Sequence, residues 1–144
     1  MRGSRKREGL RKLMYATAAR ETVSSLSVSL ARFLEGLDPI LEKYCRLLAD
    51  FDADLLREIA DDFIELGNSL YAEFARASHR VLCVTALEAG LRLREKSIEL
   101  QGRELRGEDV EYLADIYDLF KLIADKIRSG EYEEGLERMQ ASRR

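Results

Sequence analysis

Apolar residues recur every three or four positions along most of the chain, which is the spacing of one face of an α-helix. No stretch alternates apolar and polar residues between turn signals, as a β-strand does. The first stripe consists of Ala16, Ala19, Val23, Leu26, Leu30, Phe33 and Leu37. We therefore expect a first helix from about Arg5–Glu8 to Gly36, because glycine tolerates the left-handed turn that follows many helices.

The dipeptide Asp38-Pro39 predicts the start of a second helix. An aspartate at the N-cap accepts hydrogen bonds from free amides, and proline at the first helical position lacks an amide that would be unpaired there. The stripe that follows consists of Leu41, Cys45, Leu48, Leu55, Ile59, Phe63 and Leu66. Because it runs in register throughout, we expect one helix ending at Leu66, with a break near Phe51–Asp54 as the alternative.

Three further helices are expected. Gly67-Asn68-Ser69 indicates a stop and a new cap before a helix from about Leu70 to Gln101, and Gly90 is a candidate kink within it. The apolar line assigned to its buried side is Leu70, Phe74, Val81, Val84 and Leu91. After a polar connection over residues 102–107, a fourth helix ends near Arg128. The residues assigned to its buried side are Val110, Leu113, Tyr117, Phe120, Ala124 and Ile127. A short final helix then covers Glu131 to about Gln140.

These elements predict an all-α fold, an antiparallel four-helix bundle with a long first helix and a short C-terminal helix. The 144 residues suit a single domain, 1–144, with a sizeable core. Residues 1–8 either begin the first helix or form a disordered basic arm.

The amino-acid composition indicates a class of organism and a cellular compartment. Charged residues make up 35% of the chain, and asparagine, glutamine and cysteine are scarce, which suits a thermophilic prokaryote. No apolar run is long enough to cross a membrane, and no signal peptide is evident, so we expect a cytoplasmic protein. Cys45 and Cys83 lie on or beside apolar stripes and are expected to be buried, reduced thiols.

Charge is unevenly placed along the sequence. Residues 1–20 carry seven basic residues and one acidic residue, which gives +6, whereas the rest carries 17 basic and 26 acidic residues, which gives −9. A basic stretch of this kind neutralises the phosphates of nucleic acid. The candidate nucleic-acid-binding residues are Arg5, Lys6, Arg7, Arg11 and Lys12.

Candidate catalytic chemistry is sparse. The single histidine, His79, cannot form a ligand set by itself, and we expect it at the surface or at a helix cap. Glu58 and Asp62 lie one helical turn apart, and Asp115 on a later helix is placed to face them. These three carboxylates are the candidate metal ligands of a small metal-dependent hydrolase. No catalytic residue and no cofactor is otherwise indicated.

The leading hypothesis is a non-enzymatic bundle that acts by protein–protein association, either with itself as a homo-oligomer or as a subunit of a complex. A first helix longer than its neighbours would overhang the bundle and expose an apolar stripe, and such stripes are commonly covered by another subunit. The alternatives are a nucleic-acid-associated protein that uses the basic N-terminal segment, and the metal-dependent hydrolase. No membrane partner is expected.

Overall fold

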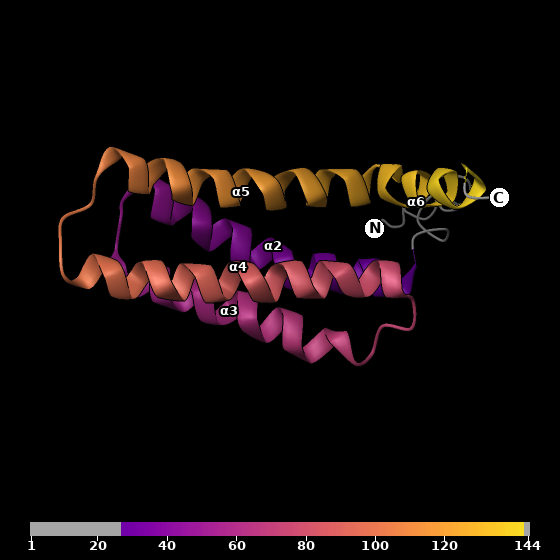
Figure 1. The fold of residues 1–144 in the computed structure, drawn as a ribbon, viewed down its shortest axis with the longest axis horizontal. Helices are drawn as coiled ribbons and strands as arrows, with labels where there is room; N and C mark the ends of the chain where they lie inside the picture. The colour runs from indigo at the N-terminus through magenta and orange to yellow at the C-terminus, as the bar shows by residue number, and fades with distance from the viewer. Residues whose placement is uncertain (1–26, 143–144) are drawn as a thin grey trace, which may run out of the picture. The chain divides into compact units, whose positions relative to one another are not determined.

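A computed structural model describes residues 27–142. This part of the chain is helical, with short connections and no strand (Figure 1), which confirms the all-α class. The helices are α2 (Val28–Ala49), α3 (Ala53–Tyr71), α4 (Ala77–Gln101), α5 (Gly107–Arg128) and α6 (Glu131–Ser142). The predicted start of the first helix and its stripe from Ala16 to Leu26 lie outside the described residues.

The described residues divide between two compact units. Residues 32–126 form one, here called the main unit, and residues 27–31 and 127–142 belong to the other. The main unit contains α3, α4, helix α2 from Arg32 onward and helix α5 up to Lys126. Helix α6 belongs to the second unit. The prediction of a single domain over 1–144 stays a prediction.

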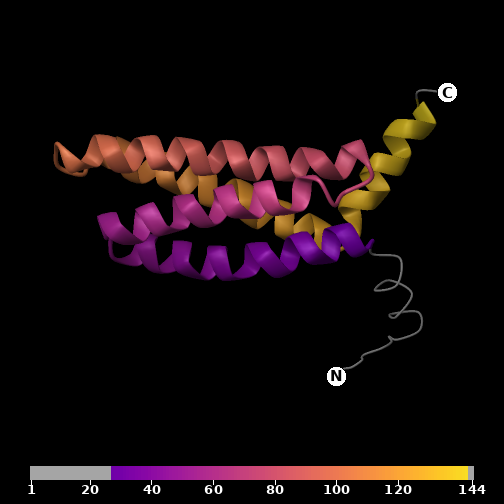
Figure 2. The same ribbon diagram turned by 90° about the horizontal axis from the view of Figure 1, so that it is seen from below.

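Within the main unit, successive helices run in opposite directions (Figures 1 and 2). Arg32 near the start of α2 pairs with Glu73 just after α3, and Lys43 further along α2 pairs with Glu58 early in α3. The order of contacts is likewise reversed between α3 and α4, where Asp61 pairs with Arg94 and Gly67 lies against Leu87.

Aromatic side chains connect three helices in the interior of the main unit. The ring centroid of Phe63 on α3 lies 6.4 Å from that of Tyr44 on α2 and 4.7 Å from that of Phe120 on α5. All three side chains are buried. The Tyr44 hydroxyl donates a hydrogen bond of 2.6 Å to the carbonyl oxygen of Leu113, which satisfies its polar end. Burial raises the pKa of Tyr44 well above its ordinary value.

The predicted helix end at Gly36 and the start at Asp38-Pro39 are wrong, because α2 runs continuously through Pro39. Proline in a helix interior removes a backbone hydrogen bond and costs about 3 kcal/mol. Leu37 and Ile40, on either side of it, are buried, and this burial offsets the cost. Gly36 has a different role from the one expected, since a Cβ atom there would overlap the side chain of Leu66 on α3.

The expectation of one helix from Asp38-Pro39 to Leu66 is also wrong, and the alternative break near Phe51–Asp54 is what the structure shows. Helix α2 ends at Ala49 and α3 begins at Ala53. Asp52 is the N-cap, and its carboxylate accepts a 2.9 Å hydrogen bond from the Asp54 amide. Each helix turns its own apolar stripe to the same interior, so a stripe in register does not require a single helix.

The expected stop at Gly67-Asn68-Ser69 is wrong, because α3 continues to Tyr71. A Cβ atom at Gly67 would lie 2.5 Å from the Cys83 carbonyl oxygen of α4. Gly90 is equally close to α3, since its Cβ would lie 2.7 Å from the Ala60 carbonyl oxygen. Both glycines are therefore places where the backbones of α3 and α4 approach each other.

The later boundaries agree with the sequence. Helix α4 ends at Gln101, α5 ends at Arg128, and α6 begins at Glu131, as expected. Gly130 separates α5 and α6 with a φ of 85°, a conformation that favours glycine.

Candidate interaction surface

Helix α4 carries apolar residues on two opposite sides. Its buried side consists of Leu82, Cys83, Ala86, Ala89, Gly90, Leu93 and Leu100, together with the polar residues His79 and Ser97. The sequence assigned Val81, Val84 and Leu91 to the interior, and this is wrong because all three are exposed.

Close packing explains why the interior takes the smaller residues. At Gly90 and Gly67 the backbones of α3 and α4 approach too closely to leave room for a Cβ atom. The neighbouring Ala86 fits such a contact, whereas a valine or leucine there would hold the two helices apart. The larger apolar residues of α4 are therefore left on the outward side.

Three of these exposed residues form a regular row. Val84, Leu91 and Ile98 are spaced seven residues apart, and their exposed fractions are 48%, 49% and 57%. We call them the outward row. A seven-residue repeat is the spacing at which one helix meets another in a coiled coil. Single exposed apolar residues are common, but a row at this spacing along one helix marks a candidate contact surface.

A shallow, open hollow lies between α3 and α4. Its lining residues are Asp61, Ile64, Glu65, Asn68, Ser69 and Arg94. Arg94 donates a hydrogen bond of 2.9 Å to Asp61, which links the two helices. The hollow is mostly polar and holds no cluster of nucleophile and base, so the arrangement does not indicate a reaction.

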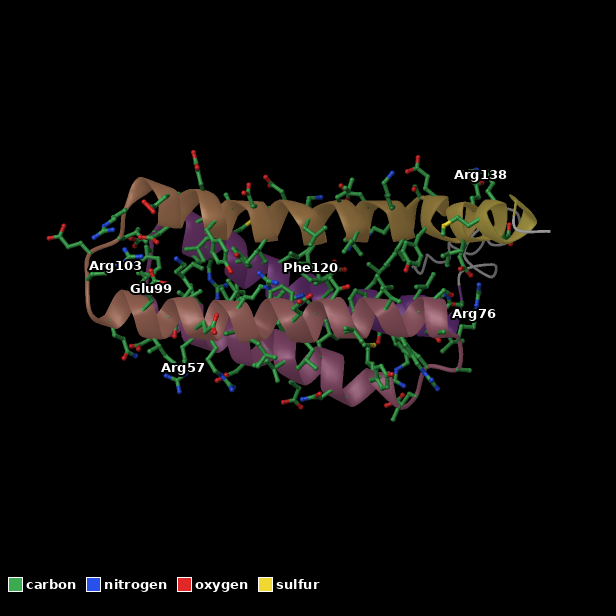
Figure 3. The ribbon with its side chains drawn as sticks, viewed as in Figure 1. Arg57, Arg76, Glu99, Arg103, Phe120 and Arg138 are labelled. Atoms are coloured by element: carbon green, nitrogen blue, oxygen red, sulfur yellow. The ribbon has the colours of Figure 1, made fainter. Side chains whose placement is uncertain are left out.

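A cluster of four charged side chains lies where α4 is connected to α5 (Figure 3). Asp109 on α5 is only 1% exposed, and both of its oxygens accept hydrogen bonds from Arg103, at 2.6 and 2.8 Å. Lys96 on α4 donates a further bond of 3.1 Å, and the backbone amide of Arg106 donates one of 2.8 Å. Glu99 also contacts Arg103 and Lys96.

These contacts stabilise the charged forms of the whole cluster. The side-chain hydrogen bond from Arg103 is the main reason that the pKa of Asp109 is well below its ordinary value, and that of Arg103 is correspondingly raised. The Arg106 amide is one of the free donors at the start of α5, so Asp109 also caps this helix. The cluster fixes the α4–α5 connection, and its donors and acceptors are used within the protein.

The candidate metal ligands are not brought together. Glu58 and Asp62 on α3 both contact the ammonium group of Lys43, and the Lys43–Asp62 distance is 2.7 Å. Their hydrogen bonds raise the pKa of Lys43, so a cationic side chain already lies beside these carboxylates. Asp115 is exposed on α5. No group of three or more histidine, cysteine or acidic side chains within 27–142 could hold a metal ion.

Two of the expectations for single side chains are wrong. His79, expected at the surface or at a cap, is buried in the first turn of α4, where its backbone amide donates to the Arg76 carbonyl oxygen. Cys83 is buried as expected, and burial raises the pKa of its thiol. Cys45 is instead exposed, with its Sγ 3.0 Å from the Tyr117 hydroxyl.

The outward side of α5 is mainly acidic, whereas the outward row of α4 is apolar. Glu111, Asp115, Asp118, Leu122 and Asp125 follow one another at spacings of three and four residues, and all are exposed. We call them the acidic row. Asp125 pairs with Lys121 of the same helix. The other three carboxylates have no ion pair among the residues that the structure describes.

The candidate nucleic-acid-binding residues Arg5, Lys6, Arg7, Arg11 and Lys12 lie outside the described part of the chain. Within that part, no helix is both long enough and apolar enough to cross a membrane.

Sequence reasoning missed the outward row, although its seven-residue spacing was visible. The signal that would have found it is the set of small residues on the opposite side of α4, because small residues mark the face on which helices pack closely. Comparisons of the chain with protein-family models, with curated proteins and with solved structures find no match.

Proposed function

We propose that this chain is an antiparallel four-helix bundle that acts by association, and that its partner is a second copy bound through the outward row of α4. The reversed order of contacts between α2 and α3 and between α3 and α4 supports the bundle. The exposure of Val84, Leu91 and Ile98 at a seven-residue spacing carries the association.

The spacing of the row suits a two-fold symmetric pair. Leu91 lies midway between Val84 and Ile98, with seven residues on each side. If two α4 helices cross antiparallel with Leu91 at the symmetry axis, Val84 of each copy meets Ile98 of the other, and Leu91 meets Leu91. A surface that is complementary to itself in this way is what a two-fold dimer requires.

The contribution of Leu91 to the free energy of dimerisation follows from its exposed area. Burying a whole leucine side chain contributes about 1.5–3 kcal/mol, so covering the exposed half of Leu91 contributes about 1 kcal/mol. Each dimer buries this residue twice, which gives about 2 kcal/mol. Since 1.4 kcal/mol is a factor of ten in affinity, losing both contacts raises the Kd about thirtyfold. A glutamate there also leaves a carboxylate in the interface, so the loss is at least this large.

The test compares Leu91→Glu with Val110→Glu. Val110 on α5, which the sequence wrongly assigned to the buried side, has a similar exposed fraction, 43%. It lies outside both rows, so the control makes the same chemical change elsewhere. Size-exclusion chromatography with light scattering, over a concentration series, should show a dimer for the unaltered chain and for Val110→Glu. Leu91→Glu should be monomeric at the same concentrations. A monomeric unaltered chain, or equal association of the two variants, contradicts the proposal.

A further inference from the structure

We propose that the acidic row of α5 is the docking surface for the basic N-terminal stretch, residues 2–20, of a second copy of this chain. This inference rests on the proposed self-association but uses a different surface. Leu113 and Phe120 occupy the buried side of α5, whereas the row lies on the outward side, where Leu122 is 52% exposed. Glu111, Asp115 and Asp118 have no ion pair within residues 27–142.

The acidic residues of the row differ in their surroundings from the acidic residues of neighbouring segments. Asp61 and Asp62 on α3 and Asp109 at the start of α5 are each neutralised by a lysine or arginine from another segment. Within the described part of the chain, no lysine or arginine neutralises Glu111, Asp115 or Asp118, and these three carboxylates lie side by side on one face. Like charges at this spacing on a helix repel each other, so an external cation on the row is favourable.

The same chain carries a stretch of complementary charge. Residues 1–20 contain seven basic residues and one acidic residue. The row extends over 15 residues from Glu111 to Asp125, or about 21 Å from the first to the last at a rise of 1.5 Å per residue. Residues 5–20, in the helix that their sequence predicts, extend over about 22 Å. Charge and length therefore match, and the apolar positions Leu10 and Leu13 of that stretch suit the exposed Leu122.

The experiment exchanges the charges between the two partners. One variant reverses the charge of the row, Asp115→Lys with Asp118→Lys. Another reverses the charge of the basic stretch 2–20, called the arm below, by Arg7→Glu with Arg11→Glu and Lys12→Glu. Each variant alone places like charges on both partners, so its self-association, measured by sedimentation velocity at low salt, should weaken about tenfold or more. An equimolar mixture restores opposite charges in both contacts between copies, so it should associate as strongly as the unaltered chain.

The matched control for the row is Glu35→Lys with Glu42→Lys. These exposed carboxylates lie on α2, which carries neither row, and change the net charge by the same amount, so they report any general effect of charge. Their variant should associate like the unaltered chain. Circular dichroism of every variant confirms that the helical content is kept.

Three outcomes overturn the inference. In the first, the row and arm variants associate normally while Leu91→Glu dissociates, so the proposed function stands without this contact. In the second, the mixture gains nothing over the separate variants, so the arm does not bind the row of another copy. In the third, a labelled single-stranded oligonucleotide binds the unaltered chain, loses affinity on arm reversal, and row reversal leaves self-association unchanged. The basic stretch then binds nucleic acid and not the row.

Discussion

Gly90→Ala should destabilise the protein, although alanine is the better helix former. In a helix interior, alanine is favoured over glycine by about 1 kcal/mol. At Gly90 the new Cβ would lie 2.6 Å from Ile64 Cγ1 and 2.7 Å from the carbonyl oxygen of Ala60. The second neighbour is backbone, so relief requires α3 and α4 to separate.

The size of the effect follows from these two terms. Overpacking a closely packed interior costs about 1–3 kcal/mol, and a clash with backbone belongs at the upper end of that range. Subtracting the helix preference leaves a net loss of about 2 kcal/mol. An unfolding entropy of roughly 2.1 cal/mol/K per residue over 144 residues is about 0.3 kcal/mol/K, so the Tm should fall by about 7 °C.

The matched control is Gly135→Ala. This glycine lies inside α6 with nothing within 4 Å of the added Cβ, so only the helix preference applies. Thermal unfolding followed by circular dichroism should show a lowered Tm for Gly90→Ala and an unchanged or higher Tm for Gly135→Ala. A Tm for Gly90→Ala at or above that of the unaltered chain refutes the close approach of α3 and α4.

Two further predictions concern the charged groups at helix starts. Asp109→Asn should lower the Tm at pH 7, because the folded pKa of Asp109 is depressed: its contribution is present above the unfolded pKa of about 3.9 and is lost as the pH falls through the folded value. The Tm difference from the unaltered chain should therefore shrink below about pH 4. As a control, Asp115→Asn, on an exposed carboxylate with no ion pair within residues 27–142, should leave the Tm at pH 7 unchanged. Asp52→Ala should destabilise the protein by about 1 kcal/mol in urea unfolding because it removes the N-cap of α3, whereas Asp52→Asn should keep most of that stability, and equal losses for the two would exclude a capping role.

The helical class was predictable because the spacing of apolar residues is a local property of the sequence. The ends at Gln101 and Arg128 were also predictable, since polar, glycine-containing connections follow them. The misplaced ends share one cause: Gly36 and Gly67 were interpreted through their conformational freedom, whereas in the structure they leave room for a neighbouring helix. That neighbour is distant in sequence, so nothing nearby in the chain distinguishes the two roles.

The candidate surfaces also depend on segments that are distant in sequence. The sequence does not tell which apolar side of α4 is buried, because the buried side includes alanine and glycine and the outward side includes the larger Val84 and Leu91. The predicted connection over residues 102–107 places Asp109 at the start of the next helix, as in the structure. Its partner Arg103 lies in the preceding connection, and Lys96 lies on another helix, so their convergence depends on the tertiary fold.

The close contact of α3 with α4 has a consequence for how the chain acquires its structure during synthesis. Gly67 and Cys83, which meet across this contact, are only 16 positions apart, and the two helices are joined by residues 72–76. Contacts between near neighbours in sequence form fast, because little chain entropy is lost in closing the loop. We expect this hairpin to assemble as soon as α4 has left the ribosome, and α5 then meets a template that already exists.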